Sequence, residues 1–290
     1  MKQKISTLQM IYREGKEQLE AAGVPDADLD AWYLLEFVTG ISKARYYGNP
    51  EAGIDEREAL KYRDVIRQRA ERIPLQHITG EQEFMGFSFQ VDEHVLIPRQ
   101  DTETLVEEAL EVLKPKMKIL DLCTGSGCIL LSLLKLGEKR GIAGLKGTGA
   151  DISREALKVA EENGRRLEIP EDRVAWVRGD LFENLEGPFD LLVSNPPYIP
   201  SGELSGLQEE VRLHDPALAL DGHEDGLYFY RRIAAEAGKY LRDGAYLMLE
   251  IGWDQGEAVS TLLEVAGYRE VKVKKDLSGN DRVVRGRYGK

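Results

Sequence analysis

Apolar residues in the first quarter of the chain recur at the spacing of one helix face, as at Leu8, Ile11 and Leu19. Glycine and proline pairs interrupt this periodicity and divide the segment into four expected helices. The fourth begins at Asp55, where a glutamate three residues later completes a capping-box pattern. The pattern predicts that residues 1–73 form a small N-terminal helical bundle, in which no chemistry can be recognised.

A different pattern follows, in which apolar and polar residues alternate. Phe84, Phe87 and Phe89 alternate with polar neighbours around Met85-Gly86. Alternation around a glycine-containing turn is typical of two paired strands. We therefore predict a β-hairpin linker at residues 74–100.

The remainder, residues 101–290, alternates between short β-rich runs and longer helical patterns. Such alternation predicts an α/β fold with a mostly parallel sheet and helices on both faces. The last two strands have no helix between them, which predicts an antiparallel edge. The strands are expected at 118–122, 146–150, 174–177, 189–194, 245–251, 268–274 and 282–287, and the helices at 128–136, 153–167, 226–241 and 255–266.

Composition and charge restrict the classes of function. Among 290 residues the formal net charge is −12, whereas proteins that bind nucleic-acid phosphates usually carry a basic surface. No stretch reaches the roughly 20 apolar residues that span a bilayer, and the first residues lack the apolar block of a signal peptide. We expect a cytoplasmic monomer with no membrane and no nucleic-acid partner. Cys123 and Cys128 are expected to be reduced, and no motif predicts a metal.

The segment from Asp121 to Gly127 joins the first strand of the predicted sheet to its first helix. Gly125 and Gly127 lack the Cβ atoms that would hold a ligand away from the backbone, and open α/β sheets bind ligands at such turns. Asp151 ends the next strand, where a carboxylate can accept hydrogen bonds from ribose hydroxyls. Asp180 follows the third strand. A tight turn without a ligand would explain the glycines but not these two acids.

Two cofactors suit a glycine-rich turn of this kind. NAD requires a third glycine, where this chain has the bulky Leu130, and a helix N-terminus free to bind pyrophosphate. The carboxylate of Asp121 suits a cofactor with a cationic end better than one with two phosphates. The sequence therefore favours S-adenosylmethionine, which would leave as S-adenosylhomocysteine.

The sequence Asn195-Pro196-Pro197-Tyr198 follows the fourth strand and is the candidate reaction site. Adjacent prolines stiffen the backbone and have no N–H, so their carbonyls remain available as acceptors. The Asn195 side-chain oxygen and the Pro196 carbonyl can bind both N–H groups of a planar amide, while Tyr198 lies against its flat face. An amide nitrogen is a poor nucleophile, and catalysis would depend on alignment and preorganised dipoles.

These motifs occur together with further segments that span nearly the whole chain. They are Thr79-Gly80, Phe84-Met85-Gly86-Phe87, Leu96-Ile97-Pro98-Arg99, Glu210-Val211, Asp215-Pro216, Asp225-Gly226-Leu227 and Asp276-Leu277-Ser278-Gly279. The set resembles the PrmC (HemK) family, the N5-glutamine methyltransferases of peptide-chain release factors. The resemblance implies a seven-stranded, Rossmann-like class I methyltransferase domain and, as substrate, the glutamine of the Gly-Gly-Gln motif of class I release factors.

The resemblance also implies roles for individual residues. Arg99 and the proline before it would fold over the cofactor, and Asn195, Pro196 and Tyr198 would be catalytic. Cys123 stands where the family usually has glycine, and Leu181 where an aromatic residue often borders adenine. The cofactor-binding residues would be Cys123, Thr124, Gly125, Ser126, Gly127, Asp151, Asp180, Leu181 and Asn195, and the substrate-binding residues Asn195, Pro196, Pro197 and Tyr198.

Several alternatives remain open from the sequence. Arg99 and Glu103 either contact the cofactor or form a surface ion pair, and Tyr228 and Tyr230 are interpreted as packing residues. The chain could instead methylate a glutamine of a ribosomal protein. An adenine-N6 nucleic-acid methyltransferase shares the Asn-Pro-Pro-Tyr motif but should carry a basic face for a flipped base. A module that only senses the cofactor would be expected to lose that motif.

Overall fold

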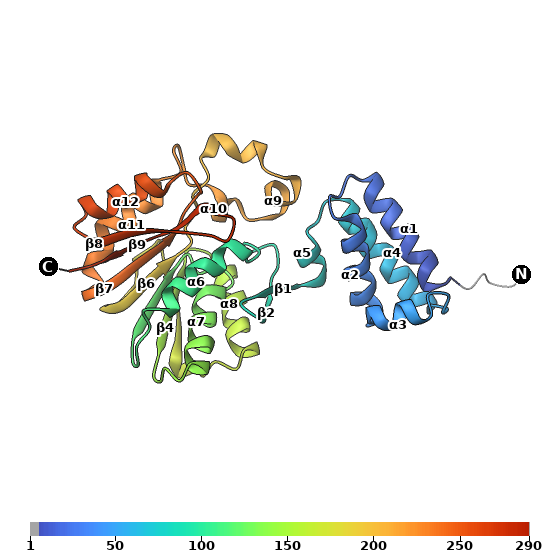
Figure 1. The fold of residues 1–290 in the computed structure, drawn as a ribbon, viewed down its shortest axis with the longest axis horizontal. Helices are drawn as coiled ribbons and strands as arrows, with labels where there is room; N and C mark the ends of the chain where they lie inside the picture. Colours follow the sequence, from blue (N-terminus) through green and yellow to red (C-terminus); the bar gives the residue numbers. More distant parts are fainter. Residues whose placement is uncertain (1–5, 290) are drawn as a thin grey trace, which may run out of the picture. The chain divides into compact units, whose positions relative to one another are not determined.

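The computed structural model describes residues 6–289, which form two compact units (Figure 1). The first unit contains the described residues up to Gly80 together with Gln208–His214, and the second contains Glu81–Leu207 and the described residues from Asp215 onward. The first five residues, on which the expectation about a signal peptide rests, lie outside the described part. The domain boundaries at residues 73 and 100 remain predictions.

The first unit is helical, and the four helices expected from the sequence are present. Asp55 caps the fourth of them by accepting a hydrogen bond from the backbone N–H of Arg57 at 2.8 Å. Two further short helices, which follow the fourth helix and the Asn195–Tyr198 loop in the sequence, were not predicted. The helices are α1 (Leu8–Ala21), α2 (Ala27–Thr39), α3 (Lys43–Gly48), α4 (Glu56–Ala70), α5 (Leu75–Thr79) and α9 (Glu209–His214).

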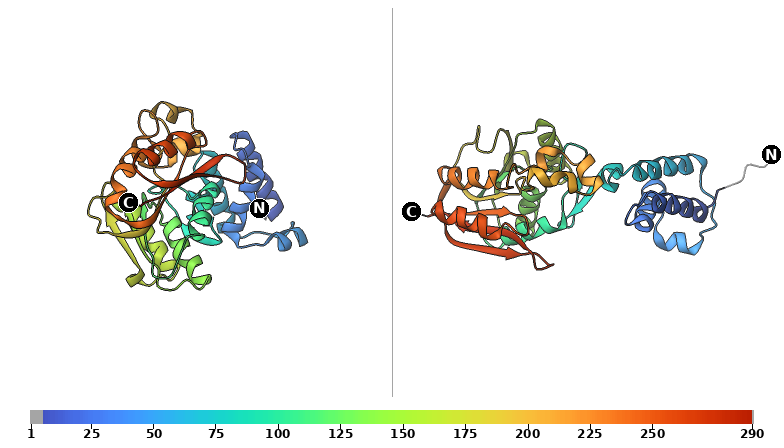
Figure 2. Two further views of the ribbon diagram at one scale, coloured as in Figure 1. Left: turned by 60° about the vertical axis from the view of Figure 1, so that its left-hand side comes forward. Right: turned by 90° about the horizontal axis from the view of Figure 1, so that it is seen from above.

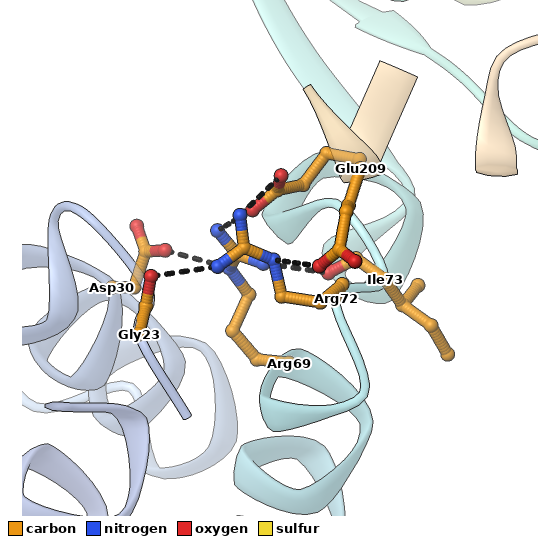
Figure 3. A network of polar contacts seen from close by, with 7 residues as sticks. Gly23, Asp30, Arg69, Arg72, Ile73 and Glu209 are labelled. Carbon is orange, nitrogen blue, oxygen red and sulfur yellow. Dashed lines mark hydrogen bonds and ion pairs between the residues drawn. The ribbon is translucent and has the colours of Figure 1, made fainter. Parts of the chain in front are cut away.

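A nearly buried ion-pair network holds α9 within this first unit (Figure 3). Arg69 on α4 donates to Asp30 at 2.7 Å and to Glu210 at 3.0 Å. Arg72 donates to Glu210 at 2.7 Å and to the carbonyl of Gly23 at 2.7 Å. Burial alone would raise the pKa of Glu210, but hydrogen bonds, including those from the two arginines, outweigh it and lower that pKa. The network is therefore arranged around ionised carboxylates.

The second unit is built on a seven-stranded sheet, as the sequence predicts. Its strand order is β5-β4-β3-β6-β7-β9-β8, with β8 and β9 together at one edge (red in Figure 2). The pairs from β5 to β7 are parallel, and β9 is antiparallel to both β7 and β8. The strands are β3 (Lys118–Leu122), β4 (Lys146–Asp151), β5 (Val174–Arg178), β6 (Phe189–Ser194), β7 (Leu241–Glu250), β8 (Arg269–Lys275) and β9 (Asp281–Arg287).

A separate hairpin precedes this sheet and belongs to the same unit. Strands β1 (Glu81–Phe84) and β2 (Phe87–Gln90) pair around Met85-Gly86, which confirms the predicted turn. Glu103 accepts a hydrogen bond from the Met85 N–H at 2.7 Å and thereby fixes the turn against helix α6 (Glu103–Leu110). This helix is absent from the elements predicted from the sequence.

Helices cover both faces of the sheet, and the alternation of buried residues along the strands explains how (Figure 1). On β3, Ile119 packs into a core with residues of α6 and of α7 (Cys128–Lys139), whereas Leu120 packs into a core with residues of α11 and α12. Side chains of successive strand residues point to opposite faces, so one strand supplies both cores. The remaining elements are α8 (Arg154–Arg166), α10 (Ala217–Leu220), α11 (Tyr228–Glu236) and α12 (Gly256–Val265), with short 3-10 turns at Gln100–Thr102, Glu171–Arg173, Ser201–Gly206 and Ala237–Lys239.

The strand register brings the predicted motifs to one edge of the sheet. Leu122, the last residue of β3, pairs with Ala150 on β4 and with Ser194 on β6. From β3 the chain continues to β4 and β5 on one side, and β6 and β7 then follow on the other side of β3. This reversal is a topological switch point, where α/β sheets form their ligand crevices. The segments after all three strands therefore begin side by side.

Among residues 6–289, no helix combines the length and the apolar character that crossing a membrane would require.

We expect Arg69→Met to lower the free energy of unfolding of the protein by about 3 kcal/mol, because removing one partner leaves Asp30 and part of Glu210 buried without a counter-charge. Urea unfolding followed by circular dichroism measures this loss. Arg67→Met on the same helix is the matched control, because Arg67 pairs with Asp64 at the exposed surface and should cost less than about 1 kcal/mol. Equal losses in the two variants would contradict the structural role of the network.

Candidate active site

A cavity of about 460 Å³ opens at the edge of the sheet where β3, β4 and β6 end. Its volume lies within the range of small-molecule sites in proteins. Three of the predicted cofactor- and substrate-binding residues, Gly127, Pro196 and Tyr198, are not among its lining residues. Those that do line it are Cys123, Thr124, Gly125, Ser126, Asp151, Asp180, Leu181, Asn195 and Pro197.

The turn after β3 has left-handed backbone at both of its glycines. Gly125 and Gly127 both have positive φ, at 54° and 77°. A Cβ on Gly125 would meet nothing within 4 Å, whereas one on Gly127 would approach Leu131 and Trp176 to 3.1 Å. Gly125 thus leaves its surroundings open, and Gly127 is required by packing. Cys123 also has positive φ, 57°, a backbone conformation that glycine adopts more readily than cysteine.

Asp121 lies beneath this turn and has no exposed surface. Its Oδ2 accepts a hydrogen bond from the Thr124 hydroxyl at 2.6 Å, while Oδ1 has no partner among the described residues. Burial raises the pKa of Asp121 to about 7. The carboxyl group therefore holds the turn in place through Thr124 and does not line the cavity. The expectation that Asp121 favours a cationic ligand has no direct contact with the cavity to support it.

Asp151 occupies the end of β4 and faces the cavity. Its two oxygens accept hydrogen bonds from the N–H groups of Gly125 and Ser153, both at 2.9 Å. Burial raises the pKa of Asp151, although these backbone hydrogen bonds oppose the shift. Each carboxylate oxygen retains a second acceptor position, so the side chain is oriented by the protein and still able to accept from a ligand.

The acid after the third predicted strand is held differently. Asp180 is exposed and accepts hydrogen bonds from Arg232 at 2.9 and 3.0 Å, one to each oxygen. Leu181 follows with positive φ, 53°, and its side chain is buried at the cavity wall. This part of the wall therefore combines an ion pair with an apolar side chain.

The Asn195–Tyr198 loop leaves β6 next to the β3 turn. The Ser194 hydroxyl donates to the carbonyl of Leu122 at 2.7 Å and joins the two strand ends. At the other end of the loop, Gln255 donates to the carbonyl of Tyr198 at 3.0 Å. Between these anchors, neither the Asn195 side-chain oxygen nor the Pro196 carbonyl accepts a hydrogen bond from any described residue. The loop is fixed at both ends while two acceptors remain available.

The alternatives left open for Arg99 and Glu103 have different outcomes. Arg99 lines the cavity and also forms an ion pair with Asp215 at 2.6 Å, and its contact with a cofactor stays a prediction. The Asp215 side chain is only 1% exposed. Glu103 does not line the cavity and is engaged with the hairpin.

Aromatic residues of the cavity were missed by the sequence analysis. Tyr228 and Phe229 line it, and the ring of His223 lies 4.2 Å from that of Tyr228 between centroids. Tyr228, interpreted as a packing residue, packs against Phe229 and also lines the cavity, whereas Tyr230 is fully buried as expected. No local pattern in the sequence distinguishes Tyr228 from its aromatic neighbours Phe229 and Tyr230.

Both cysteines are free thiols, and burial raises the pKa of Cys128 to about 12. A thiol with such a pKa is inert at neutral pH. Within the part of the chain that the structure describes, no group of three or more histidine, cysteine or acidic residues is placed to hold a metal ion. The polar side chains at the cavity are therefore carboxylates, hydroxyls, the Asn195 amide, two histidines and the guanidinium groups of Arg99 and Arg232.

Comparison with known proteins gives consistent matches over the whole chain. A family model described as the PrmC N-terminal domain matches residues 11–80, and one described as the methyltransferase small domain matches residues 100–210. A protein of Caulobacter vibrioides named release factor glutamine methyltransferase is 41% identical over 283 residues, which cover 97% of this chain and 96% of that protein. One of the same name from Geobacter sulfurreducens is 39% identical and covers 99% of both chains.

Among solved structures, a methyltransferase from Pyrococcus furiosus superposes with a TM-score of 0.51 over 71% of this chain and 90% of its own. It is 19% identical in sequence. This likeness supports the fold.

We expect Gly127→Ala to destabilise the protein more than Gly125→Ala. Both substitutions place a Cβ on left-handed backbone, which costs about 1–2 kcal/mol, but only Gly127→Ala adds contacts with Leu131 and Trp176, for about 1–3 kcal/mol more. Chemical denaturation of the two variants measures the difference. A Gly125→Ala variant as unstable as Gly127→Ala would show that the space beside Gly125 is not open.

Proposed function

We propose that this chain, which belongs to the release factor glutamine methyltransferase family, transfers a methyl group from S-adenosylmethionine to the side-chain amide nitrogen of a glutamine in a peptide-chain release factor. The glutamine is proposed to be that of the Gly-Gly-Gln motif of class I release factors. One observation carries the proposal. The Asn195–Tyr198 loop is held at both ends by hydrogen bonds, and its two acceptors, the Asn195 side-chain oxygen and the Pro196 carbonyl, have no partner among the described residues. This loop, which we call the proline corner, lies beside a cavity of cofactor size.

The residues at the cavity fit S-adenosylmethionine. Asp151 can accept hydrogen bonds from the ribose hydroxyls, because its oxygens are oriented by Gly125 and Ser153 but retain acceptor capacity. Leu181 offers an apolar wall for the adenine, and the open space beside Gly125 admits the methionine part. When bound, the cofactor supplies a methyl group activated by its positively charged sulfur.

The Asn195–Tyr198 loop is proposed to hold the substrate amide. The Asn195 side-chain oxygen and the Pro196 carbonyl accept its two N–H groups, which fixes the plane of the amide and favours positive charge as it develops on nitrogen. Because the amide nitrogen is weakly nucleophilic, most of the rate enhancement comes from alignment. The methylated nitrogen is acidic and releases its extra proton to solvent, so no strong base is needed.

Tyr198 is proposed to lie against the flat face of the amide and to stay protonated there. Burial, reinforced by the nearby carboxylate of Glu250, raises the pKa of Tyr198 to about 12. A phenol with this pKa does not act as a base at neutral pH. The residue therefore contributes shape and contact area.

A glutamine of a ribosomal protein is the main rival substrate, because the same amide site would serve it. An adenine-N6 activity on nucleic acid fits less well with a net charge of −12. We further propose that the protein acts as a monomer in the cytoplasm, where translation factors are found.

Incubation of the full-length protein with methyl-labelled S-adenosylmethionine is expected to label a purified class I release factor at one glutamine, identified by peptide mass mapping. Ribosomal proteins and DNA offered in the same assay should remain unlabelled. Label in a ribosomal protein alone would replace the proposed substrate, and label in DNA would overturn the substrate class. Asn195→Ala should reduce transfer by about 100-fold or more while cofactor affinity changes only a few-fold; equal losses would mean that Asn195 is structural.

We expect Asp151→Ala to weaken cofactor binding by about 1–3 kcal/mol, the value of hydrogen bonds to a charged group. Isothermal titration calorimetry with S-adenosylhomocysteine measures the change. Asp190→Ala is the control, since Asp190 lies near the start of β6, at the opposite end of the strand, where it accepts from the Lys118 N–H. Unchanged affinity in Asp151→Ala, or an equal loss in both variants, would remove Asp151 from the proposed site.

A further inference from the structure

We propose that Glu250 is a positioning residue that determines, together with Thr102, which way the side-chain amide of Asn195 faces. This inference rests on the proposed function, because it concerns how Asn195 presents its oxygen to the substrate. Glu250 is not part of the Asn195–Tyr198 motif, and it is not among the residues that line the cavity. The residue acts through Asn195 and not by contact with the substrate.

The sheet register brings the three residues together. Ser194 on β6 pairs with Leu249 on β7, so the next residues, Asn195 and Glu250, leave their strands as neighbours. Thr102 ends the short 3-10 turn that precedes α6. Its side chain is buried, as is that of Glu250.

A hydrogen bond joins Asn195 to Thr102, and both side chains act on the carboxyl group of Glu250. The Asn195 amide donates from Nδ2 to the hydroxyl oxygen of Thr102 at 3.4 Å. Burial raises the pKa of Glu250 to about 7, and hydrogen bonding from the side chains of Thr102 and Asn195 opposes that shift. These two side chains therefore favour the ionised form of the carboxyl group.

The direction of the hydrogen bonds follows from what each group can donate. An ionised carboxylate only accepts, and a threonine hydroxyl has a single hydrogen to donate. In this arrangement the Asn195 amide already donates to the Thr102 oxygen, so the Thr102 hydrogen is free for another acceptor. We propose that it is directed to Glu250, the acceptor that leaves β7 beside Asn195. The Asn195 NH2 then faces Thr102 and its Oδ1 faces outward. Without Glu250, Thr102 could donate to Oδ1 instead, and the amide could turn to present an NH2 group to the NH2 of the substrate.

The stability of the fold does not account for a carboxyl group at this position. Glu250 is 1% exposed, and its Oε2 has no hydrogen-bond partner among the described residues. The neighbouring cation, Arg282, directs its side chain to Asp276 at 3.1 Å and Asp101 at 3.1 Å and donates to the carbonyl of Ile251. Burying an incompletely paired carboxyl group is unfavourable, and an apolar side chain of similar size is often more stable.

The test compares Glu250→Met, Thr102→Val and the double variant with the wild type, measuring kcat and KM on a class I release factor, the affinity for S-adenosylhomocysteine, and Tm. We expect Glu250→Met to lower kcat by about 10- to 100-fold. Its affinity for S-adenosylhomocysteine should stay within about 3-fold of wild type, a change of less than about 0.7 kcal/mol. Its Tm should equal or exceed that of wild type. Thr102→Val should lower kcat similarly, and the double variant should be no worse than the more impaired single variant, because both act through one amide. Glu250→Gln should recover part of kcat, since its amide oxygen can accept from Thr102.

Two controls separate positioning from general damage. Glu108→Met removes a largely buried carboxylate that pairs with Arg285 and Lys274 away from Asn195, and it should lower Tm while leaving kcat unchanged. Thr104→Val removes a second buried threonine hydroxyl on α6, and kcat should be unchanged. Full activity in Glu250→Met, a parallel loss of activity and Tm, or multiplicative effects in the double variant would overturn the proposal. A wild-type protein that does not label a release factor would instead overturn the proposed function.

Discussion

The parallel pairing of β3 with β4 and β6 is the constraint on which the candidate site depends. Leu122 lies opposite both Ala150 and Ser194, so three strands end at the same level. The glycine turn, Asp151 and the proline corner follow directly from those ends and therefore meet without long loops to position them. A one-residue slip in either pairing would exchange the faces of every side chain on the strand and separate the motifs.

Carboxyl groups at this edge are buried to a degree that stability alone does not favour. Asp121 and Glu250 both have a pKa raised to about 7 by burial, and each has one oxygen without a partner among the described residues. Asp121 organises the turn through the Thr124 hydroxyl, and Glu250 lies beside Asn195. Polar groups held at such a cost in a low-dielectric environment are typical of functional sites, where orientation matters more than stability.

The helical unit presents the opposite case, in which buried charges are paired. Arg69 and Arg72 meet Asp30 and Glu210 in a network that ties α9 to α4. The segment that carries Glu210 lies between the Asn195–Tyr198 loop and Asp215 in the sequence, and Asp215 in turn pairs with the cavity residue Arg99.

The sequence by itself determined the order of elements, the mostly parallel sheet with its antiparallel edge, and the two motifs after β3 and β6, because periodicity and turn chemistry are properties of contiguous residues. It did not determine helices α5, α6, α9 and α10, or the place of Tyr228 at the cavity wall. Only the tertiary structure brought Thr102 to Asn195, 93 residues away, and Arg69 to Glu210, 141 residues away. Such contacts depend on which strands pair and which faces pack, and no local pattern of residues encodes that.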